Sequence, residues 1–426
     1  MNTKTMRRTA ASLLAAALLL TTAGCGKKEE AVGFQPRLDT KANIQLEVTG
    51  FFGNFEALDQ VTNDFNQYYP NVTFGYQQVS GDSLEAYLDA NPHVDIFMTS
   101  MHQLHSPDST LAAHCVDLSK EEVSLEDIDP DMLKLYSIDD RQIAIPMSQD
   151  LYGVIVNETL LENAGLSLPK TAEEFLNCLQ VLKDKGYTPI QGPTSKVYAE
   201  LTRDAAFAAL CSDEKLYAAA KAGSDEAVNA LMPIFQFLDT ILENGYTDPE
   251  INASYPDDNY DGAILRFFEG EVPFWVCNTE KVSGMKKRES KSEAYQKNSF
   301  SYTYIFTPVG SDDGYVFQEP WSGFSANENG SHRDYAIEFL RFLATRDEIN
   351  KMADVKGVPS VAKEPSTSGV YEDIFSAEGS FPKVVNTGEI TPGIESKWYS
   401  CTTNYVNGNY DSAESAIRDF LTAFNQ

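Results

Sequence analysis

The chain alternates between short segments with a β-strand pattern and longer segments with a helical pattern. Residues 44–48 alternate between apolar and polar side chains, which predicts a strand. Residues 58–68 repeat apolar side chains at helical spacing, and residues 72–74 and 94–98 again have strand character. Strands that alternate with helices predict an α/β protein with a parallel sheet.

The same alternation continues through the rest of the chain. Residues 143–146 and 152–156 are short apolar runs, which we interpret as strands that cross between two lobes. Residues 171–174 have the pattern of a capping box and precede an apolar helical stripe. Residues 411–424 keep the helical spacing most clearly and predict a C-terminal helix. A chain of 426 residues is too long for one core, so we expect two lobes.

The N-terminus has the layout of a secretory signal. Lys4, Arg7 and Arg8 precede an apolar run over residues 10–20, and small residues lead to Cys25. The run is too short to span a bilayer as a permanent helix. The cysteine after the cleavage site resembles the lipobox of bacterial lipoproteins, although Thr22 stands where that motif usually has leucine.

We therefore expect residues 1–24 to be a signal peptide and Cys25 to be acylated. Residues 25–40 would form a flexible tether that holds the protein outside the cell membrane. The alternative is an ordinary signal peptide with an incidental cysteine.

The charge balance disfavours nucleic acids as partners. Removal of residues 1–24 takes away three basic residues and leaves 30 basic against 63 acidic ones, a formal charge of −33. Such a chain lacks the basic surface that nucleic acids require.

The five cysteines after Cys25 are widely spaced and predict neither a disulfide framework nor a metal motif.

Several segments resemble, in the right order, the extracellular solute-binding proteins of bacterial ABC importers, especially the sugar-binding family. The matching passages are residues 69–72, 94–97, 145–157, 163–176, 268–278 and 391–404. The last of them is similar to the C-terminus of the maltodextrin-binding members. Each passage alone is weak evidence of the family, and the resemblance depends on all of them occurring in the family's order. Val272–Pro273 and the position of Pro92 depart from the family's pattern.

The resemblance implies a two-lobed fold in which each lobe is a sheet flanked by helices and is discontinuous in sequence. We expect residues 41–150 and 276–330 in the N-terminal lobe, and residues 151–275 and 331–426 in the C-terminal lobe. Such proteins close around a solute by hinge motion and deliver it to the transmembrane subunits of a permease. The resemblance thus implies a monomeric binding protein without a cofactor.

The candidate ligand contacts begin with the three tryptophans, because a sugar presents an apolar face of C–H groups to aromatic rings. Trp398 lies in the passage that resembles the family most closely, which implies a stacking platform in the cleft; core packing is the alternative. Trp321 is flanked by small residues that permit close approach. Trp275 lies within a predicted strand beside the hinge, where a core role is at least as plausible.

Polar candidates lie in loops after strands, because open α/β sheets bind ligands at the carboxyl ends of their strands. They are Asn54, Ser100, Gln149, Asp150 and Asn278, and the aromatic Phe52 follows the same strand as Asn54. Each is also explicable as an ordinary loop residue.

Three other functions remain open. Four of the five histidines (His93, His102, His105 and His114) lie within residues 93–114, which suggests a metal site, although a dedicated zinc site needs three or four converging ligands. No nucleophile elbow, zinc-protease, P-loop or dinucleotide motif occurs, yet the many carboxylates allow a secreted glycoside hydrolase. The third alternative is a receptor that signals to a sensor instead of a permease.

Overall fold

The computed structural model describes residues 34–51, 56–80, 83–106, 108–192, 196–253, 260–309, 316–366, 383–386 and 389–425. The chain divides into two compact units, Met1–Gln35 and Pro36–Gln426, and all helices and strands given below lie in the second. Cys25 and the predicted signal peptide lie outside the described residues, so lipidation stays a prediction.

The first of two main sheets has six strands in the order β12–β11–β3–β1–β2, with β6 paired to β11. Its strands are β1 (Ile44–Gly50), β2 (Val72–Gln78), β3 (Ile96–Thr99), β6 (Ile145–Asp150), β11 (Val316–Ala326) and β12 (Lys383–Val385). Strand β1 runs parallel to β2 and β3, as the alternation of strands and helices predicted. Strand β11 runs antiparallel to β3 and β6.

The second sheet has four strands in the order β10–β7–β9–β8. They are β7 (Tyr152–Asn157), β8 (Ile190–Gln191), β9 (Phe274–Asn278) and β10 (Tyr302–Phe306). Strand β7 is antiparallel to both of its neighbours, so this sheet is mixed, where a parallel one was expected. Gly153 permits this pairing, because a Cβ atom there would collide with the backbone carbonyl of Ile305.

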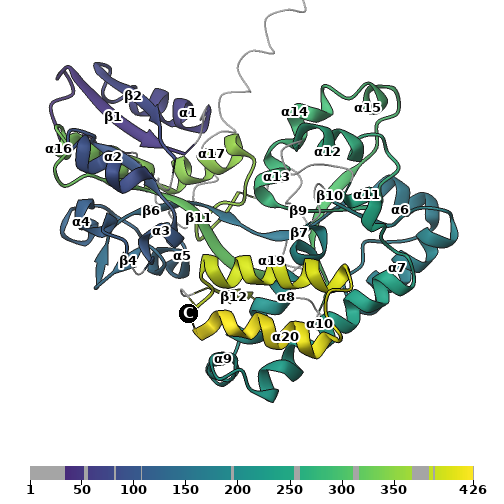
Figure 1. The fold of residues 1–426 in the computed structure, drawn as a ribbon. Coiled ribbons are helices and arrows are strands. Elements are labelled where there is room, and N and C mark those ends of the chain that lie inside the picture. Colours follow the sequence, from purple (N-terminus) through teal and green to yellow (C-terminus); the bar gives the residue numbers. More distant parts are fainter. Residues whose placement is uncertain are drawn as a thin grey trace, which may run out of the picture. The chain divides into compact units, whose positions relative to one another are not determined.

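Helices that are distant in sequence join the first sheet, and together they form what we call the first lobe. These helices are α1 (Glu56–Phe65), α2 (Leu84–Ala90), α3 (Met101–Leu104), α4 (Leu111–His114), α5 (Pro130–Lys134), α16 (Arg333–Leu343) and α17 (Arg346–Lys356). The short strands β4 (Ser137–Ile138) and β5 (Arg141–Gln142) pair with each other. Helix α17 packs beside α1 (Figure 1). The ring of Phe65 lies 5.3 Å from that of Phe339 and 5.5 Å from that of Phe342.

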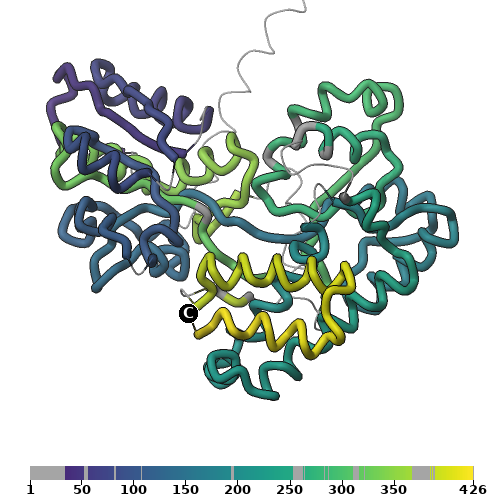
Figure 2. Tube along the Cα trace, viewed as in Figure 1, coloured from purple at the N-terminus to yellow at the C-terminus, as the bar shows by residue number. Residues whose placement is uncertain are grey.

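The second sheet and its helices form the second lobe. These helices are α6 (Glu158–Ala164), α7 (Ala172–Asp184), α8 (Val197–Cys211), α9 (Glu214–Lys221), α10 (Asp225–Glu243), α11 (Pro249–Ala253), α12 (Tyr260–Phe267), α13 (Thr279–Ser283), α14 (Met285–Glu289), α15 (Glu293–Lys297), α19 (Pro392–Val406) and α20 (Ala413–Leu421). The C-terminal helices α19 and α20, yellow in Figure 2, pack against α8 and α10. Their apolar faces belong to one large core. The predicted α/β architecture with sheets flanked by helices is confirmed.

The lobe boundaries differ from the expected ones in three places. Residues 276–306 were expected in the N-terminal lobe, but β9 and β10 pair with β7 in the second sheet. Residues 331–356 were expected in the C-terminal lobe, but α16 and α17 pack on the first sheet and on α1. Residues 383–385 were also expected in the C-terminal lobe, but β12 pairs with β11 in the first sheet. In each case segments that are far apart in sequence share one sheet or core, which local patterns do not reveal.

The first direct passage of the chain between the two sheets is very short. Strand β6 ends at Asp150 and β7 begins at Tyr152, so only Leu151 separates them (Figure 1). Within the described parts of the chain, no helix is long and apolar enough to cross a membrane.

Candidate ligand-binding site

Polar side chains converge where β6 passes into β7. Asn278, the last residue of β9, lies opposite Tyr152 in the sheet register. Glu319 in β11 lies opposite Asp150, and Pro320 lies opposite Gln149. The structure therefore brings together three of the predicted site residues, Gln149, Asp150 and Asn278.

Asp150 is buried in this region and is held by two donors. The Nδ2 of Asn278 donates to its Oδ2 at 3.1 Å, and the Oγ1 of Thr279 donates to its Oδ1 at 3.3 Å. Burial raises the pKa of Asp150 to about 8, and the negative charges of Glu319 and Glu280 add to that effect. At neutral pH this carboxyl group therefore keeps a proton for much of the time.

Gln149 of β6 forms hydrogen bonds with β11 and with the segment that contains Ser360. Its Nε2 donates to the backbone carbonyl of Ser360 at 2.8 Å, and its Oε1 accepts from Nε2 of Gln318 at 2.9 Å. The side chain is buried and both ends are occupied. We infer that Gln149 supports the site instead of contacting a ligand.

Arg203 of α8 is the centre of the charged network. Its side chain is completely buried, and its guanidinium pairs with Glu319 of β11, with Glu395 of α19 at 2.7 Å and with Asp204 at 3.2 Å. The guanidinium carbon also lies 4.3 Å from the ring centroid of Tyr152. Burial alone would lower the pKa of Arg203, but Glu319 and Glu395 raise it well above its ordinary value.

The pKa values of the two carboxylates Glu319 and Asp204 beside Arg203 are shifted in opposite directions. Burial raises the pKa of Glu319, but the charges of Arg203 and His102 outweigh that effect and leave the pKa below its ordinary value. Burial raises the pKa of Asp204 to about 7 in spite of its contact with Arg203. Glu319 is thus the ionised partner, whereas Asp204 can hold a proton near neutrality.

A second ion pair lies beside this network. Lys281 of α13 donates to Oε1 of Glu200 in α8 at 2.7 Å, and both side chains are largely buried. Lys281 also interacts electrostatically with Asp150. The other oxygen of Glu200, Oε2, is buried and has no hydrogen-bond partner among the described residues.

Two half-buried tyrosines border the charged groups. Tyr152 and Tyr399 interact through a side-chain hydrogen bond, and burial raises the pKa of Tyr399 well above its ordinary value. The ammonium group of Lys196 lies 6.0 Å from the ring centroid of Tyr399. Aromatic rings next to carboxylates, amides and a guanidinium match the C–H faces and hydroxyl rims of a sugar.

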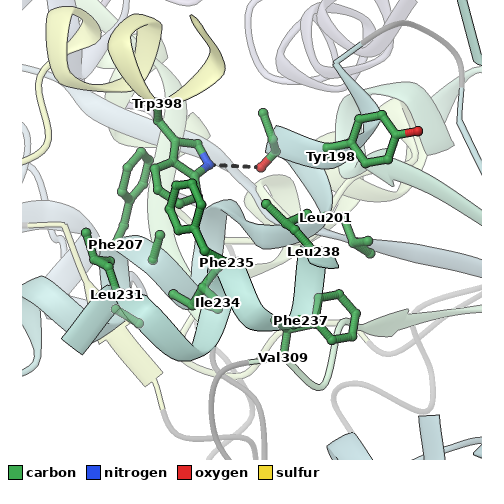
Figure 3. Packing of buried hydrophobic residues seen from close by; sticks show 14 of the residues in the cluster. Tyr198, Leu201, Phe207, Leu231, Ile234, Phe235, Phe237, Leu238, Val309 and Trp398 are labelled. Atoms are coloured by element: carbon green, nitrogen blue, oxygen red, sulfur yellow. Dashed lines mark hydrogen bonds between the residues drawn. The ribbon is translucent and has the colours of Figure 1, made fainter. Parts of the chain in front are cut away.

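Trp398 has the packing role that the sequence left open, not the stacking role. Its side chain is fully buried, and its Nε1 donates to the carbonyl of Ala199 at 3.2 Å (Figure 3). The rings of Phe207, Phe235 and Phe420 meet it edge-on at 6.2, 5.7 and 5.0 Å. With every face covered, Trp398 offers no surface to a ligand in this conformation.

The other predicted residues are distributed differently. Trp275 is buried in the core of the second lobe, near Phe267. Trp321 lies within β11, and its side chain is outside the described part of the structure. Phe52 and Asn54 also lie outside the described residues. The hydroxyl of Ser100 caps α3 by accepting from the backbone of Gln103 at 3.2 Å.

The four clustered histidines do not converge on one point. His105 contacts the carbonyl of Leu135 at 2.9 Å, and His114 faces Asp89 at 3.4 Å. Among the residues that the structure describes, no group of three or more metal-ligating side chains is assembled.

The residues that sequence reasoning missed are Tyr152, Glu200, Arg203, Glu319, Glu395 and Tyr399. A partial signal existed, since Glu200, Arg203 and Asp204 are charged residues within an otherwise apolar helix. Charged side chains are rarely buried unless they are paired, so such a helix indicates a buried network. Tyr399 follows Trp398 directly, and a helix turns by about 100° per residue, which points the two rings in different directions.

We expect Trp398→Ala to lower the free energy of unfolding by about 3–5 kcal/mol, because it leaves a large cavity in the core. Trp398→Phe should cost less, since it keeps an aromatic ring and loses only the indole donor and part of the volume. Urea denaturation of both variants measures the difference. If Trp398→Ala were as stable as the wild type and lost its affinity for the ligand, Trp398 would be a stacking residue and not a core residue.

The raised pKa of Asp150 predicts that stability falls as pH rises. Unfolded Asp ionises near pH 3.9, about the usual value, whereas folded Asp150 holds its proton until about pH 8. Between these values the folded state binds more protons, so the free energy of unfolding decreases by up to about 1.4 kcal/mol per pH unit. Asp150→Asn should flatten this slope in denaturation curves measured from pH 5 to pH 8. An unchanged slope would show that Asp150 is ionised in the folded protein.

Comparisons with known proteins agree with this architecture. Residues 53–349 match the family of bacterial extracellular solute-binding proteins. The multiple sugar-binding protein of Streptococcus mutans is 20% identical over 300 residues, which cover 68% of this chain and 67% of that protein.

Solved structures show the same fold. The apo form of RafE from Streptococcus pneumoniae matches with a TM-score of 0.71 at 18% identity, covering 92% of this chain and 99% of that one. RafE in complex with raffinose matches with a TM-score of 0.66 at 18% identity, covering 89% of this chain and 98% of that one. Because the family match extends over more than half of the sequence, the chain belongs to the bacterial extracellular solute-binding proteins.

Proposed function

We propose that this protein captures a carbohydrate outside the cell and delivers it to the transmembrane subunits of an ABC permease. It would act by binding and lobe closure, without covalent chemistry. The observation that carries the proposal is the pair of half-buried tyrosines, Tyr152 and Tyr399, beside the buried polar network around Arg203.

The position of this network suits a ligand site. It lies where β6 passes into β7, and it combines residues of β6, β9 and β11 with residues of helices α8 and α19. A solute held here would contact segments of both lobes, so that binding would favour a closed arrangement.

The relatives support carbohydrate as the solute class. RafE has been solved with raffinose, and the Streptococcus mutans relative is named a multiple sugar-binding protein. A hydroxylated ligand would also supply donors for the Oε2 of Glu200, which has no partner among the described residues.

We further propose that Cys25 is acylated and holds the protein at the outer face of the membrane. The support is the sequence pattern of residues 1–25. Attachment would keep the binding protein close to its permease, and no residue of the proposed ligand site belongs to the tether.

A thermal-shift screen tests the function directly. We expect sugars in a panel of mono- and oligosaccharides to raise the melting temperature, whereas peptides and divalent metals do not. Tyr399→Ala should weaken binding of the best sugar by about 0.5–1.5 kcal/mol, roughly 2- to 13-fold, through loss of ring stacking. Isothermal titration calorimetry measures that affinity.

Tyr405→Ala is the matched control, since Tyr405 lies on the same helix but bonds to Asp239 at 2.7 Å and packs on Phe235. We expect this variant to lose stability and to keep its affinity. Stabilisation by a peptide or a metal and by no sugar would contradict the proposed function.

A further inference from the structure

The segment that precedes the first strand is held to the first lobe by side chains that are distant in sequence. Residues 36–39 belong to no helix or strand, and β1 begins several residues later. The backbone amide of Arg37 donates to the hydroxyl of Tyr69 at 3.1 Å and to Oε1 of Glu338 at 3.0 Å. The amide of Leu38 donates to the same hydroxyl at 3.2 Å. These acceptors lie 32 and 301 residues from Arg37 along the chain.

The hydroxyl of Tyr69 is fully committed to these contacts. It accepts from the two amides and donates its one hydrogen to Oε1 of Glu338. The side chain of Tyr69 is completely buried, and its ring stacks on that of Phe65 in α1 with the centroids 4.7 Å apart. The core of the first lobe therefore sets the position of this acceptor.

Glu338 of α16 is a buried carboxylate with 3% of its surface exposed. Arg341 pairs with both of its oxygens, through Nη2 to Oε1 at 2.8 Å and through Nε to Oε2 at 2.9 Å. Burial would raise the pKa of Glu338, but hydrogen bonds from Arg341 and Tyr69 hold it below its ordinary value. A buried charge needs donors that replace its hydration, and the amide of Arg37 is one of them.

Two further contacts hold the same segment. The backbone carbonyl of Asp39 accepts from the hydroxyl of Tyr335 in α16 at 3.0 Å. The Nη1 of Arg37 donates to the backbone carbonyl of Glu122, between α4 and α5, at 2.8 Å and pairs with its carboxylate at 3.0 Å. Exposed ion pairs contribute little to stability. The buried pair of Tyr69 and Glu338 is therefore the main attachment.

We propose that residues 37–39 form a clamp that fixes the point where the membrane tether leaves the protein and assigns the tether to the first lobe. The proposal rests on the acylation of Cys25 proposed above, because a fixed exit point matters only when the chain before it is attached. The tether would then end at residue 36, whereas the sequence suggested residue 40.

The clamp shortens the reach of the tether. Cys25 lies 12 residues before Arg37 and 19 residues before Ile44, the first residue of β1. An extended chain spans at most about 3.3–3.6 Å per residue. The closed clamp would thus limit the reach from Cys25 to about 40 Å, and an open clamp would allow about 65 Å. The first lobe would stay near the membrane while the second lobe moves during closure.

Trypsin tests the clamp in membranes of cells that express the full-length chain. Lys27 and Lys28 precede the clamp, and Arg37 is its first residue. We expect trypsin to cut the wild type after Lys27 or Lys28 and to spare the bond after Arg37, as mass spectrometry of the released protein will show. Tyr69→Phe keeps the ring and loses the hydroxyl that two amides share. Cleavage after Arg37 should then be at least about tenfold faster.

Tyr136→Phe is the matched control, since Tyr136 is also completely buried in the first lobe but its hydroxyl donates to the carbonyl of Thr99 at 3.4 Å. We expect this variant to be cut like the wild type. In hydrogen exchange, the amides of Arg37 and Leu38 should exchange at least about tenfold faster in Tyr69→Phe than in the control. Tyr335→Phe, which removes the donor to Asp39 without altering a buried hydroxyl, should give a smaller increase.

The outcomes separate the clamp from the acylation on which it depends. Wild-type cleavage after Arg37 as fast as cleavage after Lys28 would overturn the clamp. Equal exchange rates in Tyr69→Phe and Tyr136→Phe would also overturn it. An unmodified Cys25 in the intact chain would instead refute the acylation, and with it the role of the clamp, whatever the exchange rates are.

Discussion

The burial of one guanidinium group sets the main constraint on this structure. Arg203 is removed from water completely, and a buried charge is tolerated only where partners replace its hydration. The partners come from β11 and α19 as well as from α8, so the positions of three elements are fixed by one side chain. Removing the cation would take the guanidinium away from Glu319 and Glu395, and Glu319 would retain the hydrogen bond from Asn386 and the weaker attraction of His102.

This constraint connects the fold to the proposed function. The guanidinium that orders β11 and α19 also stacks on Tyr152, the first residue after the passage between the two sheets. Tyr399, on the helix that carries Glu395, reaches the same place. Polar groups that are held in position before a ligand arrives lose little conformational freedom on binding, which favours both affinity and specificity.

The sequence allowed the α/β class, most strands and the strongly periodic helices to be predicted, because these depend on local patterns. The predicted strand at residues 44–48 corresponds to β1, and the predicted C-terminal helix corresponds to α20 and the turn after it. The capping residue Thr171 accepts from the backbone of Glu174, as expected.

The charged network could not be predicted in the same way. Arg203 lies 116 residues from Glu319 and 192 residues from Glu395, and no local pattern links such positions. The choice of Trp398 failed for a related reason: the family resemblance pointed to the helix that also carries Glu395 and Tyr399, but the rotation between neighbouring residues buries the ring of Trp398. Packing likewise decided the lobe to which α16 and α17 belong.

The most direct test of this account is the stability of two variants at pH 7.5. Arg203→Met should lower the free energy of unfolding by about 3–5 kcal/mol, because it leaves buried carboxylates unpaired. The double variant Arg203→Met/Glu319→Gln should recover part of that loss, since it also removes a charge that Arg203 compensates. A double variant less stable than the single one, or a single variant as stable as the wild type, would contradict the central role of Arg203.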